Sequence, residues 1–259
     1  MQSVREDSLE RLLADMEQYF LREQALFGET LLIEQPAKAK ANPMPARKPI
    51  DPRLSLFDPL PSASGGEQWM NAATLVDLNS QICQCLKCPL GHTRTRFVFG
   101  VGDPHATLML IGEAPGADED LQGEPFVGRA GQLLNKILEA ISFKREEVYI
   151  CNILKCRPPN NRTPQPEEVQ SCIPYLRKQV ELVKPKVILC LGLVAAENLL
   201  STRESLGRLR GKVLSYSNTP VMVTYHPAAL LRNPQWKKPA WEDVQALRKL
   251  HDELVSKSN

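Results

Sequence analysis

Four cysteines in two distant parts of the chain are spaced like the ligands of a metal site. They are Cys85, Cys88, Cys156 and Cys172, and the first two form a Cys-x2-Cys pair. Four thiolates can close a tetrahedral site, and zinc and a [4Fe–4S] cluster are the two occupants that this donor set favours. Asn152 and the loop 158–163 flank the third cysteine. The predicted metal site therefore anchors a segment that carries further polar side chains.

Composition limits the class of protein. The chain has 259 residues, of which 42% are hydrophobic and 24% charged, as in soluble globular proteins. No apolar run approaches the length that crosses a bilayer, and the N-terminus has mixed charges where a secretion signal would have an apolar core. With an odd number of cysteines, seven, we expect a cytoplasmic protein whose thiols bind metal or stay reduced. A net charge of +2 gives no argument for a nucleic-acid partner, which would need a local basic surface.

Three regions follow from the residue pattern. Residues 1–30 are predicted to hold an amphipathic helix, because leucines and other apolar residues recur at helical spacing between residues 9 and 20. Residues 31–71 are rich in proline and predicted to be a flexible linker. Residues 72–259 form the predicted globular domain. We expect the N-terminal helix to dock on a protein partner or on this domain.

The globular part alternates between strand and helix patterns. Four apolar runs predict buried strands at 107–111, 148–151, 186–191 and 220–224. Helical patterns follow at 130–141, 166–183, 193–200 and 240–255. This alternation predicts an α/β fold, a three-layer α/β/α arrangement with a central four-stranded parallel sheet.

Unusual residues follow the predicted strands. The segment 112–116 follows the first strand, Asn152 the second, and His226 the fourth. Ligands of parallel sheets bind beyond the carboxyl ends of the strands, so we expect a pocket where these groups converge.

Four sequence motifs carry a family resemblance. GEAPGADED (112–120), GEPFVGRAG (123–131), CNILKCRPPNNRTP (151–164) and TYHPAALLRNP (224–234), with the cysteine spacing, closely resemble the family 4 uracil-DNA glycosylases. These are iron–sulfur members of the uracil-DNA glycosylase superfamily, and the resemblance covers roughly residues 75–256. It implies a monomeric DNA repair enzyme that acts on uracil in single- or double-stranded DNA. Such an enzyme flips the base out, hydrolyses its N-glycosidic bond and leaves an abasic site without a lyase step.

The resemblance assigns roles to three side chains. Phe126 would stack on the flipped base. Asn152 would pair with uracil N3–H and O4, a pattern that cytosine reverses, provided that the amide is locked in place. His226 would donate a hydrogen bond to uracil O2 as the leaving base gains negative charge.

The segment 112–116 resembles the loop that activates water in the superfamily, and Gly112, Ala114 and Gly116 are expected to contact the substrate. Ala114 stands where many relatives carry a carboxylate. The candidates for placing the water are therefore Glu113, Glu119 and Asn161. Gly116 stands where relatives often carry an aromatic residue that excludes the thymine methyl group. Glu119 could take over that exclusion, or it could simply belong to an acidic helix start.

The resemblance also implies that the four spaced cysteines bind a structural [4Fe–4S] cluster in preference to zinc. It further suggests Leu230 and Leu231 as the wedge that fills the space left by the flipped base. Two alternatives remain open from the sequence: a module that binds uracil or lesion DNA without turnover, and a zinc-stabilised α/β interaction domain.

Overall fold

The structure is a computed structural model that describes residues 67–257. The predicted helix within residues 1–30 and the linker up to residue 66 lie outside the described residues. No helix in the described part of the chain is long and apolar enough to cross a bilayer.

A mixed sheet of six strands forms the centre of the fold, in the order β1-β3-β2-β4-β6-β5. The four inner strands are parallel: β3 (Tyr149–Asn152), β2 (Leu108–Gly112), β4 (Val187–Leu191) and β6 (Thr219–Thr224). The two edge strands are antiparallel to their neighbours: β1 (Val101–Gly102) and β5 (Leu214–Tyr216). The predicted four-stranded, wholly parallel sheet is therefore too small. The edge strands are short and partly exposed, so they lack the apolar runs that predicted the inner four.

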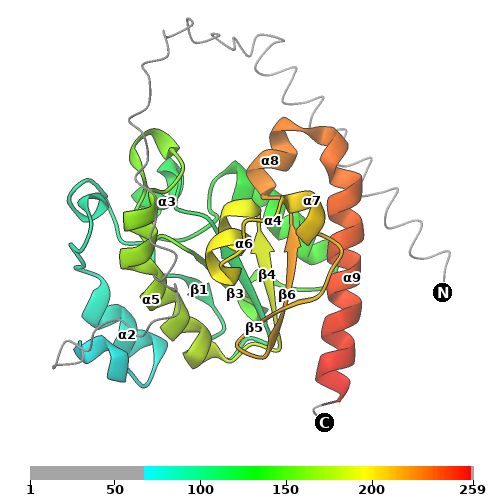
Figure 1. The fold of residues 1–259 in the computed structure, drawn as a ribbon, viewed down its shortest axis with the longest axis horizontal. Coiled ribbons are helices and arrows are strands. Elements are labelled where there is room, and N and C mark those ends of the chain that lie inside the picture. Colours follow the sequence, from blue (N-terminus) through cyan, green and yellow to red (C-terminus); the bar gives the residue numbers. More distant parts are fainter. Residues whose placement is uncertain (1–66, 258–259) are drawn as a thin grey trace, which may run out of the picture. The chain divides into compact units, whose positions relative to one another are not determined.

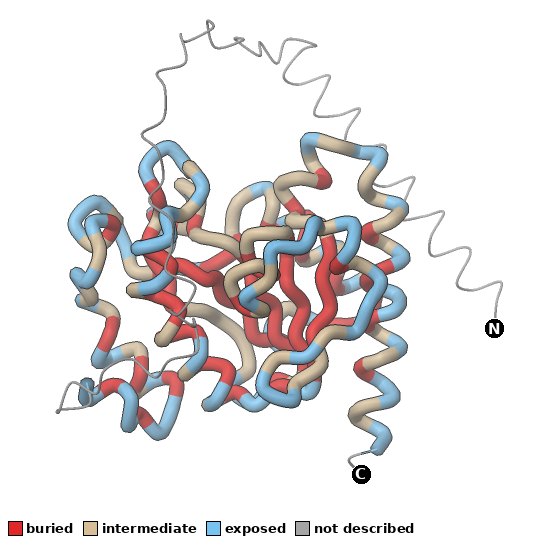
Figure 2. Tube along the Cα trace, viewed as in Figure 1, coloured by how far each residue is buried: buried red, intermediate tan, exposed pale blue. Residues whose placement is uncertain are grey.

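Helices cover both faces of this sheet (Figure 1). On one face, α4 (Arg129–Ala140), α8 (Pro227–Arg232) and α9 (Lys237–Ser256) accompany a core that includes Leu110 and Leu189. On the other, α2 (Leu75–Ile82), α5 (Pro166–Val183) and α6 (Leu193–Leu200) pack around a core that includes Ile111 and Cys190. Alternate strand residues point to opposite faces, so each inner strand feeds both cores and is buried along most of its length (Figure 2).

Shorter elements connect these layers. They are η1 (Gln68–Asn71), η2 (Pro89–His92), α3 (Ala117–Gln122), η3 (Arg145–Glu147), η4 (Pro159–Asn161), α7 (Leu206–Leu209) and η5 (Pro234–Trp236). Two of them, α3 and η4, lie in the motifs expected to form the pocket.

The folded domain begins before the predicted boundary at residue 72. Trp69, within η1, is only 8% exposed, and its ring meets that of Tyr175 edge-on with centroids 4.8 Å apart. A buried indole of this kind belongs to a core and not to a flexible linker. Residues 67–71 are therefore part of the domain.

Candidate active site

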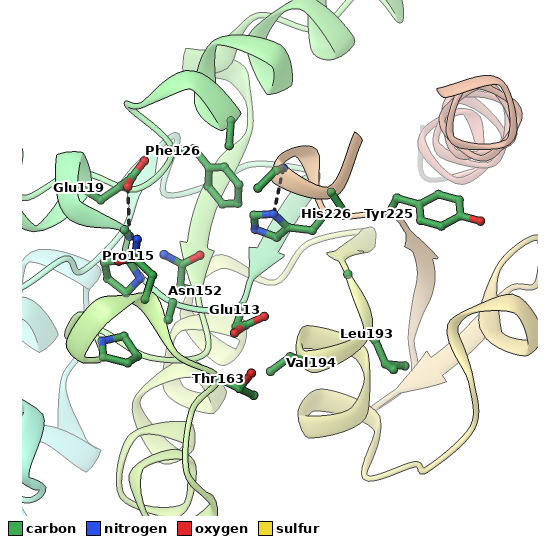
Figure 3. Close-up of a pocket in the computed structure, with 18 of the residues that line it drawn as sticks. Glu113, Pro115, Glu119, Phe126, Asn152, Thr163, Leu193, Val194, Tyr225 and His226 are labelled. Atoms are coloured by element: carbon green, nitrogen blue, oxygen red, sulfur yellow. Dashed lines mark hydrogen bonds between the residues drawn. The ribbon is translucent and has the colours of Figure 1, made fainter. Parts of the chain in front are cut away.

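A cavity of about 560 Å³ opens at the carboxyl ends of the inner strands. It is lined by the expected groups from three strand ends and by residues of α6, α7 and α8. Figure 3 shows Phe126, Asn152 and His226 turned toward one another in this cavity, with Glu113 below them. The parallel register produces this convergence, because it brings the ends of β2, β3, β4 and β6 to one edge.

Gly112 allows two of these side chains to meet. It pairs with Asn152 in the β2–β3 register. A Cβ atom at position 112 would lie 2.4 Å from Asn152 Oδ1 and 2.7 Å from Phe126 Cζ. Real carbon atoms do not approach so closely, so any larger residue here would push the amide or the aromatic ring out of place.

Phe126 is held in an uncommon backbone conformation. Its φ is 55°, its side chain is 5% exposed, and its ring lies 5.5 Å from the His226 ring at an angle of 31°. A left-handed conformation is costly for a residue other than glycine and persists where surrounding contacts fix it. One such constraint is Gly131, since a Cβ there would lie 1.8 Å from the Phe126 carbonyl oxygen.

Glu119 supplies another constraint. One carboxylate oxygen accepts hydrogen bonds from the backbone N–H groups of Val127 at 3.0 Å and Gly128 at 3.1 Å. The other accepts from the N–H of Gly116 at 3.0 Å (Figure 3). The side chain therefore ties the loop after β2 to the turn that carries Phe126, and both of its oxygens are engaged in doing so.

Asn152 presents a polar group with no partner in the described protein. The residue is 2% exposed, and its Oδ1 atom is buried without a hydrogen bond among residues 67–257. Its backbone oxygen, in contrast, accepts a hydrogen bond from Lys155 Nζ at 2.9 Å. Because buried polar atoms are nearly always paired, an unpaired amide oxygen beside a cavity is typical of a group that binds a ligand.

His226 is a neutral hydrogen-bond donor at the same edge. Its Nδ1 accepts a hydrogen bond from the N–H of Ala228 at 3.2 Å, so the ring proton of the neutral form resides on Nε2. Burial lowers the pKa of His226 to about 4, and the charge of Arg232 acts in the same direction. Gly192 makes room for the ring, because a Cβ there would lie 3.0 Å from His226 Cβ.

The other two candidates for placing water also line the cavity. Burial raises the pKa of Glu113, while nearby Arg232 partly opposes the shift. Asn161 has φ of 53°, and its Oδ1 accepts a hydrogen bond from Arg157 Nε at 2.8 Å. Ala114 lines the same wall. Of the two side chains, that of Glu113 is the one whose carboxylate oxygens make no hydrogen bond within residues 67–257, although its backbone oxygen accepts one from the N–H of Leu154 at 3.1 Å.

Several lining residues were not predicted. Tyr225 stacks on Trp236 with ring centroids 5.0 Å apart, and Leu193 and Val194 close the wall formed by α6. Tyr225 precedes His226 in the TYHP motif, which is the signal that could have identified it. Leu230 is 2% exposed and lies in the core beneath α8, so it is not available as a wedge; this part of the prediction is wrong.

The four spaced cysteines lie in one region. The pKa of Cys172 is raised to about 12, mainly by burial; the nearby thiols of Cys156 and Cys88 act in the same direction, and Lys155 opposes the shift. Burial also raises the pKa of Cys156, with a contribution from Cys85. Thiols that disfavour each other's ionisation in this way are close together and would gain from a positive occupant.

Polar side chains reach these sulfur atoms. Arg94 Nη1 donates to Cys156 Sγ at 3.2 Å, and the Tyr175 hydroxyl donates to Cys85 Sγ at 3.3 Å. Within residues 67–257, no group of three or more His, Cys, Asp or Glu side chains is arranged to hold a metal ion. In a [4Fe–4S] cluster, each thiolate binds a different iron atom, so the four sulfurs do not surround a single ion. The chemistry of the donor set therefore fits such a cluster.

Comparison with known proteins identifies the family. Residues 99–250 match the model of the uracil DNA glycosylase superfamily, and the chain belongs to that superfamily. Its relatives include proteins named type-4 uracil-DNA glycosylase. The one from Archaeoglobus fulgidus is 45% identical over 185 residues, which is 68% of this chain and 93% of the relative. Those from Pyrobaculum aerophilum and Thermotoga maritima are 45% and 42% identical, covering 66% and 65% of this chain and 91% and 90% of the relatives.

Proposed function

We propose that the protein is a DNA repair glycosylase that removes uracil from DNA by hydrolysing its N-glycosidic bond. The observation that carries this function is the buried, unpaired amide oxygen of Asn152, which lines a cavity together with Phe126 and His226. Family membership and the named relatives support the same activity. The described residues of one chain supply every group in the proposed mechanism, so the proposal requires only a monomer.

Recognition of the base depends on two side chains. The Phe126 ring stacks on uracil, which contributes about 1–3 kcal/mol and does not discriminate among bases. The Asn152 amide supplies the discrimination, because it donates to O4 and accepts from N3–H of uracil. Cytosine has a donor and an acceptor in the opposite places. Gly112 packs closely against the amide oxygen, and this packing opposes the rotation of the amide that cytosine would require.

Bond cleavage depends on His226 and a water molecule. As the bond between N1 and the sugar breaks, negative charge develops on uracil O2, and the Nε2–H group of His226 stabilises it. The imidazole acts as a neutral donor, in accordance with its lowered pKa. The sugar approaches an oxocarbenium state that reacts readily with water. Glu113 and Asn161 orient that water, and Glu119 holds Phe126 in position. No lysine acts as a nucleophile, so the product is an intact strand with an abasic site.

The four spaced cysteines would hold a [4Fe–4S] cluster, whose contribution when bound would be structural, because hydrolysis of the N-glycosidic bond moves no electrons. Arg94 and Tyr175 support the ligands through hydrogen bonds to Cys156 and Cys85. Zinc is the alternative occupant. Quantifying iron and acid-labile sulfide in anaerobically purified protein tests the proposal: about four of each per chain supports it, and zinc without sulfide contradicts it.

The activity is tested with a labelled oligonucleotide that contains one uracil, followed by alkali to cleave abasic sites. We expect cleavage by the wild-type protein and a loss of about 1,000-fold in Asn152→Ala. Asn79→Ala is a matched control, because Asn79 Oδ1 is also buried and unpaired but lies on α2, outside the cavity. A strand that stays intact with cluster-loaded wild-type protein would leave only a DNA-binding module.

A further inference from the structure

Lys155 is a fully buried lysine three residues beyond the end of β3. Its exposed fraction is 0%, and within residues 67–257 it is the largest fully buried side chain. Lysine is rarely buried to this extent without a specific partner. The Nζ atom donates to the backbone oxygen of Asn152 at 2.9 Å and to the side-chain oxygen of Gln179. Both acceptors are uncharged, so this is a hydrogen-bonded anchor and not an ion pair with a carboxylate.

The second acceptor is itself fixed. Gln179 is also 0% exposed, and its Nε2 donates to the backbone oxygen of Phe99 at 3.0 Å and to the hydroxyl of Tyr149 at 3.1 Å. The lysine nitrogen is therefore held by a chain of hydrogen bonds that begins on α5 and reaches the start of β3. Because the lysine nitrogen is held in this way, it fixes the position of the Asn152 backbone carbonyl to which it donates.

The backbone of Lys155 connects to the cysteine region. Its N–H group interacts with the Cys172 thiol, its carbonyl oxygen accepts from the N–H of Val98 at 2.9 Å, and Cys156 is the next residue. The residue thus lies between the strand end that carries the unpaired amide and two of the expected cluster ligands.

We propose that Lys155 is a positioning residue for uracil recognition: by binding the Asn152 carbonyl, it fixes the amide that reads the base. The inference rests on the proposed function of this site. Without the lysine, a buried carbonyl at the end of β3 loses its partner, and the strand end shifts or admits water to satisfy it. The Asn152 amide then loses the fixed orientation on which discrimination between uracil and cytosine depends.

The test compares Lys155→Met with the wild-type protein, because methionine keeps much of the volume and cannot donate a hydrogen bond. Lys249→Met, at an exposed position of α9, is the matched control. Two affinities are measured on cluster-loaded protein: that for free uracil, as an inhibitor of the reaction, and that for DNA with a tetrahydrofuran abasic-site analogue. The analogue has no base, so it reports on DNA contacts without the Asn152 amide.

We expect Lys155→Met to bind free uracil about tenfold more weakly, which corresponds to about 1.4 kcal/mol, while binding of the abasic analogue stays within about twofold. A general loss of structure would weaken both equally, and that result would overturn the proposal. Unchanged uracil affinity would also overturn it.

A second variant tests the proposal if Lys155→Met does not fold or does not retain its cluster. Gln179→Leu removes one acceptor and leaves the lysine in place, and we expect it to weaken uracil binding about threefold. If it binds uracil like the wild type, the proposed role is wrong. Absence of any wild-type activity would instead contradict the proposed function itself.

Discussion

The cavity edge and the cysteine region are built in different ways. At the cavity edge, backbone register places Gly112 against Asn152, and the side chains that meet there come from strand ends. In the cysteine region, the thiols come from a loop after α2, a loop after β3 and from α5, and they disfavour each other's ionisation. The first site consists of side chains that the sheet register brings together, whereas for the second we propose that a positively charged occupant holds the thiols together. This difference predicts how each responds to change.

The largest expected effect is at the cavity edge. Gly112→Ala places a carbon atom where Asn152 and Phe126 already lie, so both recognition groups move. We expect single-turnover excision of uracil to fall by at least about 100-fold, with little change in cluster content. Gly207→Ala is the control, since a Cβ there meets nothing within 4 Å. If the two variants excise uracil at the same rate, the cavity edge can move enough to accommodate the added carbon atom.

Glu119→Gln tests the constraint on the aromatic ring. The amide nitrogen cannot accept a hydrogen bond, so at least one backbone N–H group after Phe126 or at Gly116 loses its partner. We expect a loss of about 2 kcal/mol in the free energy of unfolding, measured with urea, and a fall of about tenfold in excision rate. Asp118→Asn, at an exposed position of the same helix, should leave both quantities unchanged.

Cys172→Ser tests the other half of the comparison. On the proposal that these thiolates bind an iron–sulfur cluster, removing one of them should release iron and lower the thermal midpoint by roughly 4–8 °C, the shift that about 2 kcal/mol gives in a domain of this size. Visible absorption and differential scanning calorimetry measure the two effects. Cys83→Ser, outside the four-cysteine set, is the control. A variant that keeps its full iron content would remove Cys172 from the ligand set.

The smallest expected effect concerns pH. His226 has a folded-state pKa of about 4, below the ordinary value of 6.5, so the unfolded chain binds more protons between these values. Its contribution to stability is therefore complete above about pH 6.5 and declines as pH falls toward 4. From pH 7 to pH 5, we expect this residue to account for a loss of about 1–2 kcal/mol. In urea denaturation at pH 7 and at pH 5, the free energy of unfolding of His226→Gln should fall by this much less than that of the wild type. An identical pH dependence in the variant would show that the imidazole is not neutralised by burial.

Much of the fold could be predicted from local patterns. The inner strands are continuous apolar runs, and α4, α5, α6 and α9 have clear periodicity, so both groups are predicted within a few residues of their observed bounds, whereas the short helices α2 and α8 are not predicted. The edge strands β1 and β5 were missed because they are short and partly exposed. Trp69 was assigned to the linker because a single aromatic residue beside a proline-rich stretch gives no periodic signal, although tertiary contact with Tyr175 buries it.

The sequence by itself determined which residue types stand at the strand ends and how the cysteines are spaced, because both are local patterns along the chain. Only the tertiary structure decided what those residues do to one another. The Glu119 carboxylate joins two loops, and the Lys155 nitrogen holds the carbonyl of Asn152. Such contacts depend on distances between segments set by sheet register and helix packing, and no periodicity in the sequence records them.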